Sequence, residues 1–198
     1  MLASCGNDQS VRVWSVHGGQ CLHDLRQHTH VVETVAFAPE SAERTLSTAG
    51  SDSTSAPYSN GTSGGAAAAA AAEEAWGDGE GGDAGGGGVL GAVGRRFLAS
   101  GSRDKTVKLW NATVGQCLMT FSVHENWVRC VAFHPSGAFV LSASDDRSVR
   151  AFDVKTGRCA RTLEDAHGHF VTSLAMHHTS PIVVSGGVDQ ELHVWECR

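Results

Sequence analysis

The sequence lacks a hydrophobic run of the ~18 residues that a membrane-spanning helix needs. Its first residues, MLASCGND, have neither the basic region nor the apolar region of a signal peptide. No Cys-x-x-Cys pair is present among the six cysteines, so the usual zinc-binding spacing is missing. These absences predict a cytosolic protein with reduced thiols, no metal or other cofactor, and no membrane association.

Basic residues are absent from residues 51–94, which hold six of the 21 acidic residues. The remaining 15 acidic residues equal the 15 Lys and Arg of the chain, so the rest of the protein is formally neutral. A neutral surface argues against a dedicated nucleic-acid site and against an electrostatic membrane anchor. We therefore expect neither nucleic acid nor membrane among the partners.

The same segment holds 13 of the 24 glycines and a run of seven alanines. It is too poor in apolar side chains to offset its chain entropy, so we predict a long disordered insertion at residues 51–94. Tyr58 and Trp76 are either a docking motif or part of a tolerated low-complexity expansion. A phosphate-loop interpretation of its glycines is disfavoured, because no strand precedes them and no Lys-Ser/Thr pair follows.

One pattern recurs four times along the chain, which indicates a repeat architecture. The strings SVRVW, TVKLW, SVRAF and ELHVW end at Trp14, Trp110, Phe152 and Trp195. An aspartate stands six residues before each of these aromatic residues and a serine ten residues before it. The last two spacings are 42 and 43 residues, whereas the first is 96, as expected if one unit contains the insertion.

Histidine and cysteine follow the same period. His28, His124 and His167 each precede an apolar strand, and Cys21, Cys117 and Cys159 share one repeat position. Cysteines in three different units cannot meet at one metal ion, so we interpret them as small buried residues on an outer strand.

Each unit reads as four short strands separated by turn residues, and we find no convincing amphipathic helix. Strands such as VAFAP and IVVSGG are apolar at consecutive positions, which is typical of sheets covered on both faces by other sheets. The fold class is therefore all-β, and a radial stack of four-stranded blades satisfies the pattern.

Period, strand count and the His, Ser, Asp and Trp markers together resemble the WD-repeat β-propeller family everywhere outside the insertion. That resemblance implies a hydrogen-bonded structural network in each blade, made by the four marker residues. Its members here are His28, Ser100, Asp104, Trp110, His124, Ser142, Asp146, His167, Ser185, Asp189 and Trp195. Phe152 replaces tryptophan in the third unit, so we expect a weaker blade there.

Without the insertion the chain holds about 3.7 units, whereas propellers need ~4–8 blades to close. We therefore expect a partial propeller from a longer protein, with open edges on its terminal blades. The expected segments are an incomplete first blade (1–27), the first strand of the second blade (28–50), the insertion (51–94), the rest of the second blade (95–123), the third blade (124–166) and an incomplete last blade (167–198).

Several strings are more specific: LASCGNDQSVRVW, ASGSRDKTVKLW, CLMTF, NWVR, AHGHFVTSL and VDQELHVWECR. They resemble the C-terminal half of the lissencephaly-1 family of cytoplasmic dynein regulators, which also carries an extended loop after an APES string. The resemblance implies seven blades and an N-terminal dimerising region in a complete member. It implies binding to the dynein motor domain and its cofactors, a non-catalytic association with platelet-activating-factor acetylhydrolase subunits, and a role in nuclear positioning, mitosis and transport at microtubules and centrosomes.

The turn before each WD strand and the loop after each histidine are expected to open on one rim. Arginine with an exposed tryptophan is typical of binding hot spots. The candidate partner-binding residues are Arg103, Lys105, Trp127, Arg147 and Phe170. In the family, the positions matching Arg103, Trp127 and Arg147 contribute to motor binding; many relatives have lysine at the third. The alternative is that the arginines are solvated turn residues and Trp127 is packing.

Three other functions compete. Substrate receptors of ubiquitin ligases typically carry arginine two residues after the WD pair, where this chain has His17, Thr113 and Lys155. An enzyme is disfavoured, because no nucleophile or carboxylate pair has a motif spacing and the paired histidines belong to the repeat or to loops. The third alternative is that the chain is a truncated fragment without a function.

Overall fold

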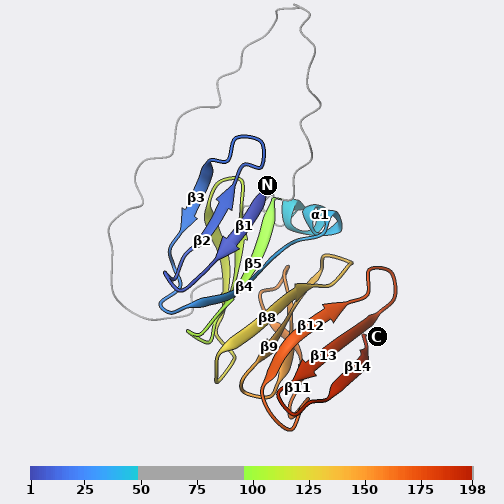
Figure 1. The fold of residues 1–198 in the computed structure, drawn as a ribbon. Helices are drawn as coiled ribbons and strands as arrows, with labels where there is room; N and C mark the ends of the chain where they lie inside the picture. The colour runs from blue at the N-terminus through green and yellow to red at the C-terminus, as the bar shows by residue number, and fades with distance from the viewer. Residues whose placement is uncertain (49–95, 198) are drawn as a thin grey trace, which may run out of the picture. The chain divides into compact units, whose positions relative to one another are not determined.

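The computed structural model describes residues 1–48 and 96–197, and nearly all of their regular structure is antiparallel β-sheet (Figure 1). Four sheets follow one another along the chain. The first contains β1 (Leu2–Cys5), β2 (Val11–Trp14) and β3 (Cys21–Leu25). The second contains β4 (Val32–Phe37), β5 (Phe97–Ser102), β6 (Val107–Asn111) and β7 (Gln116–Phe121). The third contains β8 (Val128–Phe133), β9 (Phe139–Ser144), β10 (Val149–Asp153) and β11 (Cys159–Leu163), and the last β12 (Val171–Met176), β13 (Ile182–Gly187) and β14 (Leu192–Glu196).

The predicted all-β class, a partial series of propeller blades, is confirmed by these sheets of three or four strands. Where each blade begins and ends along the chain stays a prediction. The predicted disordered insertion at residues 51–94, with Tyr58 and Trp76, lies outside the described residues.

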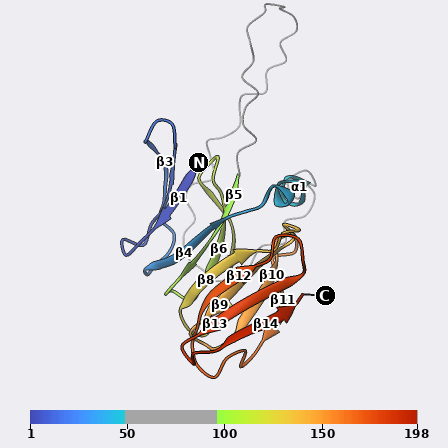
Figure 2. The same cartoon turned by 45° about the vertical axis from the view of Figure 1, so that its right-hand side comes forward.

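The sheets pack face to face through three apolar clusters, one between each pair of successive sheets. Trp110 lies in the cluster between the first and second sheets, Phe152 in that between the second and third, and Val171 in that between the third and last. Strand β8 contacts β4 on one side and β12 on the other, and these strands are seen again in the turned view of Figure 2. Burial on both faces explains the consecutive apolar positions of the strands.

Strand β5 shows how closely two sheets approach, because all six of its residues are buried. A Cβ on Gly101 would lie 2.6 Å from Val128 Cγ1 in the next sheet and 2.8 Å from Thr34 Cγ2. Only glycine leaves room for this contact.

The repeat extends to the irregularities of the sheets. The register shifts just before Trp14, Trp110 and Phe152, where each aromatic residue comes to face a cysteine of the outer strand. The three cysteines thus mark a β-bulge. Their predicted burial is wrong, since Cys21 is exposed and Cys117 and Cys159 are half-buried.

The expectation of no helix is also wrong, because α1 (Glu40–Thr48) follows β4 in the segment expected to hold only a strand. Glu40 and Glu43 lie in its first turn, where carboxylates interact favourably with the helix dipole. Ala42 and Leu46 are the two apolar residues in the helix sequence; they stand one turn apart and are buried against the core, so the apolar stripe is too short to recognise in the sequence. The helix reaches the third sheet, because Ser41 Oγ donates to the Pro135 carbonyl at 2.5 Å.

Candidate functional site

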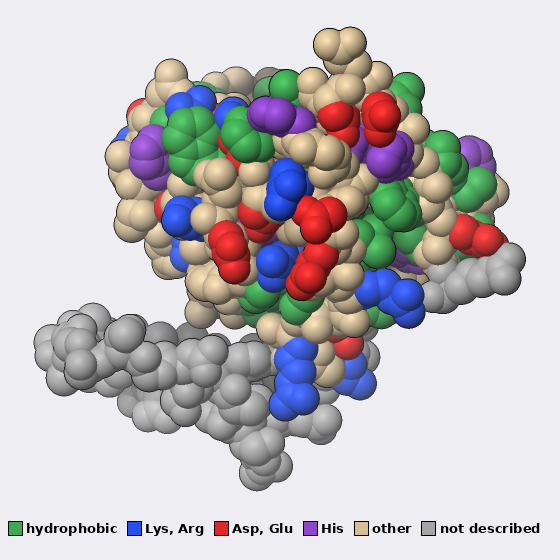
Figure 3. Space-filling view, turned by 90° about the horizontal axis from the view of Figure 1, so that it is seen from below, with side chains coloured by type: hydrophobic (Ala, Val, Ile, Leu, Met, Phe, Trp, Pro, Cys, Tyr) green, Lys and Arg blue, Asp and Glu red, His purple; other side chains and the backbone are tan. Residues whose placement is uncertain are grey.

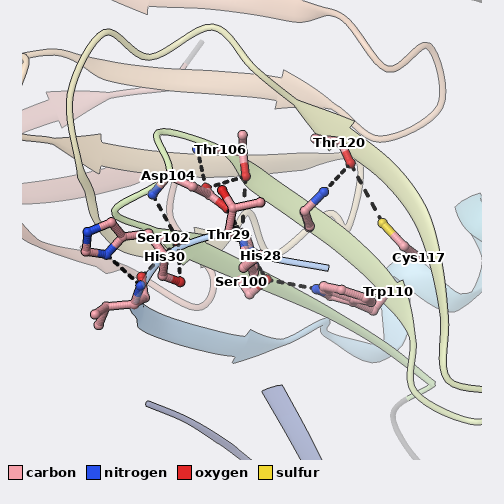
Figure 4. Close-up of polar contacts among 12 residues, drawn as sticks. His28, Thr29, His30, Ser100, Ser102, Asp104, Thr106, Trp110, Cys117 and Thr120 are labelled. Atoms are coloured by element: carbon pink, nitrogen blue, oxygen red, sulfur yellow. Dashed lines mark hydrogen bonds and ion pairs between the residues drawn. The ribbon is translucent and has the colours of Figure 1, made fainter. Parts of the chain in front are cut away.

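A chain of hydrogen bonds ties the loop before β4 to the turn between β5 and β6 (Figure 4). His28 Nδ1 donates to Asp104 Oδ2 at 2.7 Å, and its Nε2 lies 2.7 Å from Ser100 Oγ. Trp110 Nε1 donates to Ser100 Oγ at 2.8 Å. Thr106 Oγ1 donates to the other oxygen of Asp104 at 2.6 Å. Within the described residues no buried side-chain nitrogen or oxygen lacks a partner, which is what a stable polar network requires.

The third and last sheets repeat this arrangement. His124 joins Asp146 at 2.7 Å and Ser142 at 2.6 Å, and His167 joins Asp189 at 2.9 Å and Ser185 at 2.8 Å. Trp195 donates to Ser185 at 2.9 Å. In the third sheet Phe152 supplies no N–H but is fully buried and stacks on Phe121, with ring centroids 4.6 Å apart. The weakness expected of this blade stays a prediction.

The network lowers the pKa of its carboxylates. Burial alone would raise the pKa of Asp104, but hydrogen bonds from His28 and Thr106 outweigh it and hold that pKa well below its ordinary value. Asp146 is lowered in the same way, against its own burial, by His124 and Ser148. Both carboxylates are therefore ionised at neutral pH and serve as fixed acceptors.

The residue after each turn aspartate adopts a left-handed backbone conformation. The four are Gln9, Lys105, Arg147 and Gln190, with φ between 65° and 70°. Residues other than glycine rarely adopt this conformation, and it costs of order 1 kcal/mol. The same geometry in all four turns places a long polar side chain at an equivalent position of each repeat.

Trp127, in the loop before β8, lies at the centre of a charged cluster. The guanidinium carbons of Arg103 and Arg129 lie over its ring, 4.5 and 5.0 Å from the centroid. Glu33 pairs with both arginines, and Arg129 also forms a bidentate pair with Asp145, with its shortest contact at 2.8 Å. The two positive and two negative charges balance, so the indole is held in place by a neutral network.

The structure brings together two of the five candidate partner-binding residues, Arg103 and Trp127. Lys105 is exposed in its turn. Arg147 is exposed and pairs with Asp165 at 2.9 Å. Phe170 is exposed, and its ring centroid lies 4.3 Å from that of His169. The roles of these residues in binding stay proposals.

Sequence reasoning missed Glu33, Arg129 and Asp145. Glu33 and Arg129 stand five residues after His28 and His124, so opposite charges occupy one repeat position in successive units. That exchange of sign between neighbouring first strands was the available signal. Asp145 carries the same signal, because its position is occupied by Arg103 in the preceding unit.

We call the surface formed by the four aspartate turns and the loops that carry His28, His124 and His167 the Asp-turn rim. All these turns lie at the lower end of the sheets in Figure 1, and Figure 3 views that end. Lys and Arg, Asp and Glu, and His side chains are interspersed there with hydrophobic ones. Such a mixture suits a protein partner better than a polyanion.

Two kinds of site are absent from residues 1–48 and 96–197. No group of three or more His, Cys, Asp or Glu side chains there could hold a metal ion. None of the helical structure in that part of the chain is long and apolar enough to cross a membrane.

Comparison with known proteins agrees with this geometry. The family described as "WD domain, G-beta repeat" matches residues 92–111, 115–153 and 157–196. The nuclear distribution protein PAC1-2 of Uncinocarpus reesii is 38% identical over 87% of the chain, and that of Arthroderma otae, PAC1, is 37% identical over 88%. The lissencephaly-1 homolog of Dictyostelium discoideum is 40% identical over 57% of the chain.

The chain spans 31%, 40% and 26% of the length of these three relatives, so it corresponds to a minor part of each. Its matched repeats include the aspartate turns and the aromatic residues of the network. The chain belongs to the WD-repeat family, and within it is similar to the nuclear distribution and lissencephaly-1 proteins.

Proposed function

We propose that this chain is a non-catalytic protein-binding scaffold of the cytoplasmic dynein pathway and that it contacts its partner through the Asp-turn rim. The names of its relatives, nuclear distribution protein and lissencephaly-1 homolog, support the pathway. The observation that supports the rim as the contact surface is the Trp127 cluster, in which Arg103 and Arg129 lie over one half-buried indole.

Such a cluster suits binding because its side chains are ordered before a partner arrives. An indole fixed by two guanidinium groups loses little conformational freedom on association, and this lowers the cost of binding. Tryptophan and arginine are the residue types that dominate measured interface energies. Glu33 and Asp145 neutralise the arginines, which favours a partner with mixed polar and apolar chemistry over one with high charge.

The partner we propose is the dynein motor domain, with dynein cofactors as further partners. Catalytic subunits of a platelet-activating-factor acetylhydrolase are a second proposed class. The role would be in nuclear positioning, mitosis and cargo transport, in the cytoplasm at microtubules and the centrosome. Arg103, Trp127 and Arg147 would contribute most, with Lys105 and Phe170 at the border of the contact.

The test compares binding of the 198-residue chain to a purified dynein motor domain before and after alanine substitution. Trp127→Ala is expected to weaken binding by about 2 kcal/mol, roughly thirtyfold, because a hot-spot aromatic residue is lost. Arg103→Ala and Arg147→Ala are expected to cost about 1 kcal/mol each.

The matched control is Arg161→Ala, which removes the same side chain from an exposed position of β11. Unchanged binding in that variant, with loss in the three rim variants, supports the proposal. Equal affinities in all variants would show that the rim is not the contact surface. No detectable binding of the unmodified chain would reject the motor domain as its partner.

A further inference from the structure

One position of the repeat carries a permanent cation in three sheets and a histidine in the fourth. The residue two before the aromatic of each WD strand is Arg12, Lys108, Arg150 and His193. The register is the same in all four sheets, because each of these residues lies opposite the network serine of the adjacent strand. Of the four residues at this position, His193 is thus the one whose side-chain type titrates near neutral pH.

Both ring nitrogens of His193 face atoms that only accept hydrogen bonds. Nδ1 lies 2.7 Å from the Ala166 carbonyl oxygen, and Nε2 lies 2.9 Å from Glu191 Oε2. A neutral imidazole has one N–H and cannot donate to both. The protonated ring has two and satisfies both acceptors, so this geometry is that of an imidazolium.

The His193 ring stacks on His167 of the network, with centroids 4.3 Å apart and planes 14° from parallel. His167 differs in its partners, because Asp189 accepts from its Nδ1 while the Ser185 hydroxyl, which already accepts from the Trp195 indole, donates to its Nε2. A neutral His167 completes this chain of bonds. The stack therefore joins one charged ring to one neutral ring.

Ala166 connects this charge to the neighbouring sheet. Its buried backbone N–H donates to the Arg147 carbonyl at 3.0 Å, and its carbonyl accepts from His193. The Arg147 side chain pairs with Asp165, the residue before Ala166. A continuous path of hydrogen bonds thus runs from β14, through the loop before β12, to the aspartate turn of the third sheet.

We propose that protonated His193 is a clasp that holds the loop around Ala166 against the Arg147 turn, and that the joint between the third and last sheets loosens when this proton leaves. The loop also carries Phe170 to the Asp-turn rim. The clasp is therefore a positioning device for the Arg147 and Phe170 part of that surface. This last step rests on the proposed function, whereas the clasp does not.

The charged and titratable groups around the ring support its protonation. The hydrogen bond to Glu191 is the largest cause that raises the pKa of His193, and the Ala166 carbonyl and the charges of Glu191 and Asp189 add to it against partial desolvation. His167 is stacked on the ring, and Arg147 with Asp165 lies beyond Ala166. The strand beside it, β13, contributes Ser185 at the facing position, which carries no charge.

The sign of the pH dependence follows from a raised folded-state pKa. The stability from the clasp is fully present below the unfolded histidine value of about 6.5 and is lost as pH rises through the folded value. A lysine at this position would stay charged across that range.

The direct test is an NMR titration of the histidine ring C–H signals in the full 198-residue chain, with the His193 signal assigned by its loss in His193→Gln. We expect its midpoint above that of a histidine model peptide, and a lower midpoint in Glu191→Gln. A His193 midpoint at or below that of the peptide would overturn the proposal, whatever the variants do.

The second test measures thermal unfolding between pH 6 and pH 8.5 for the wild type and His193→Lys. The Tm of the wild type is expected to fall relative to that of the lysine variant as pH rises. Curves that stay parallel over this range would contradict the clasp.

Affinity for the motor domain at the two ends of this range separates the clasp from the proposed function. We expect affinity to fall by a factor of a few with rising pH in the wild type and less in His193→Lys. Equal pH dependence in both would reject the positioning role. If the motor domain does not bind at any pH while His193 titrates as expected, the proposed function fails and the clasp stands.

Discussion

One serine hydroxyl bonds the network histidine in each of the last three sheets. Ser100 Oγ carries one hydrogen and bonds both the His28 imidazole and the Trp110 indole. Ser142 Oγ in the next sheet bonds the His124 imidazole but has no indole to satisfy, because Phe152 occupies the aromatic position. The two serines are equally buried and differ only in the number of groups that depend on them.

Ser100→Ala should therefore cost more stability than Ser142→Ala. The first leaves two buried groups without a partner and is expected to lower the free energy of unfolding by about 3–4 kcal/mol; the second leaves one and is expected to cost about 1–2 kcal/mol. Urea unfolding followed by circular dichroism measures both, each substitution serving as the other's control. Equal losses would mean that the indole bond contributes nothing.

The ionised aspartates of the network make the fold sensitive to acid. Because the pKa of Asp104 is lowered in the folded state, its contribution is present above the unfolded value of about 3.9 and is lost as pH falls through the folded value. Asp104→Asn should unfold more readily at pH 7 and lose less stability on acidification. Its slope of unfolding free energy against pH is expected to be smaller by up to about 1.4 kcal/mol per pH unit below pH 4.

A urea titration series from pH 2.5 to pH 7 measures that slope. Asp153→Asn is a suitable control, since Asp153 lies at the end of β10 and its side chain accepts only backbone N–H groups of the following turn in the described contacts. Identical slopes in wild type and Asp104→Asn would show that the Asp104 carboxylate has the same pKa in the folded and the unfolded state.

Among the elements, helix α1 is the one that could not be predicted from the sequence. The strands could be placed because their markers recur, and Trp110 and Trp195 are each the last residue but one of their strands. The helix occurs in one unit, and it is held by a contact with the third sheet, which lies some 90 positions further along the chain. Local patterns carry no information about such a contact.

Gly137, in the turn between β8 and β9, is fitted to this helix. Its φ is 72°, and a Cβ there would lie 2.1 Å from the backbone nitrogen of Ala42. Gly137→Ala is expected to lower the free energy of unfolding by about 3 kcal/mol or more, because backbone atoms must move in addition to the left-handed strain. Gly19→Ala isolates the strain alone, about 1 kcal/mol, since φ is 62° with no atom within 4 Å of the added Cβ.

Chemical unfolding of the two variants gives the comparison. The difference between them, about 2 kcal/mol, is the part due to the helix contact. Equal losses would imply that α1 adapts freely to the added methyl group.

At the scale of the whole molecule, the sheets are linked by charge as well as by apolar packing. Glu33 on β4 pairs with Arg103 of its own sheet and with Arg129 of the next. The repeat predicts that Arg103 and Trp127 lie on one rim, since it gives equivalent positions in each unit. It could not give their mutual contact, because that depends on how one sheet is turned against its neighbour.

Glu33→Gln should lower the free energy of unfolding by about 1 kcal/mol, because two partly buried arginines lose their shared counter-charge. The loss should shrink in 1 M salt, where screening weakens the original pairs. Unfolding at low and high salt measures both effects. Glu125→Gln, at an exposed position of the loop before β8, is the control; a loss as large in that variant would attribute the effect to net charge alone.

The described residues on the two sides of the predicted insertion meet in a fixed geometry. The Ala38 N–H donates to the Phe97 carbonyl at 2.9 Å, and the Arg96 N–H to Glu43 Oε1 at 2.6 Å. Because the ends are held together in this way, a change in the length of chain between them acts mainly through loop closure, and each doubling of a loop's length costs only about 0.6 kcal/mol. The junction lies at the opposite end of β4 and β5 from the Asp-turn rim. It is therefore a natural place to exchange the segment for a reporter domain while the rim is studied unchanged.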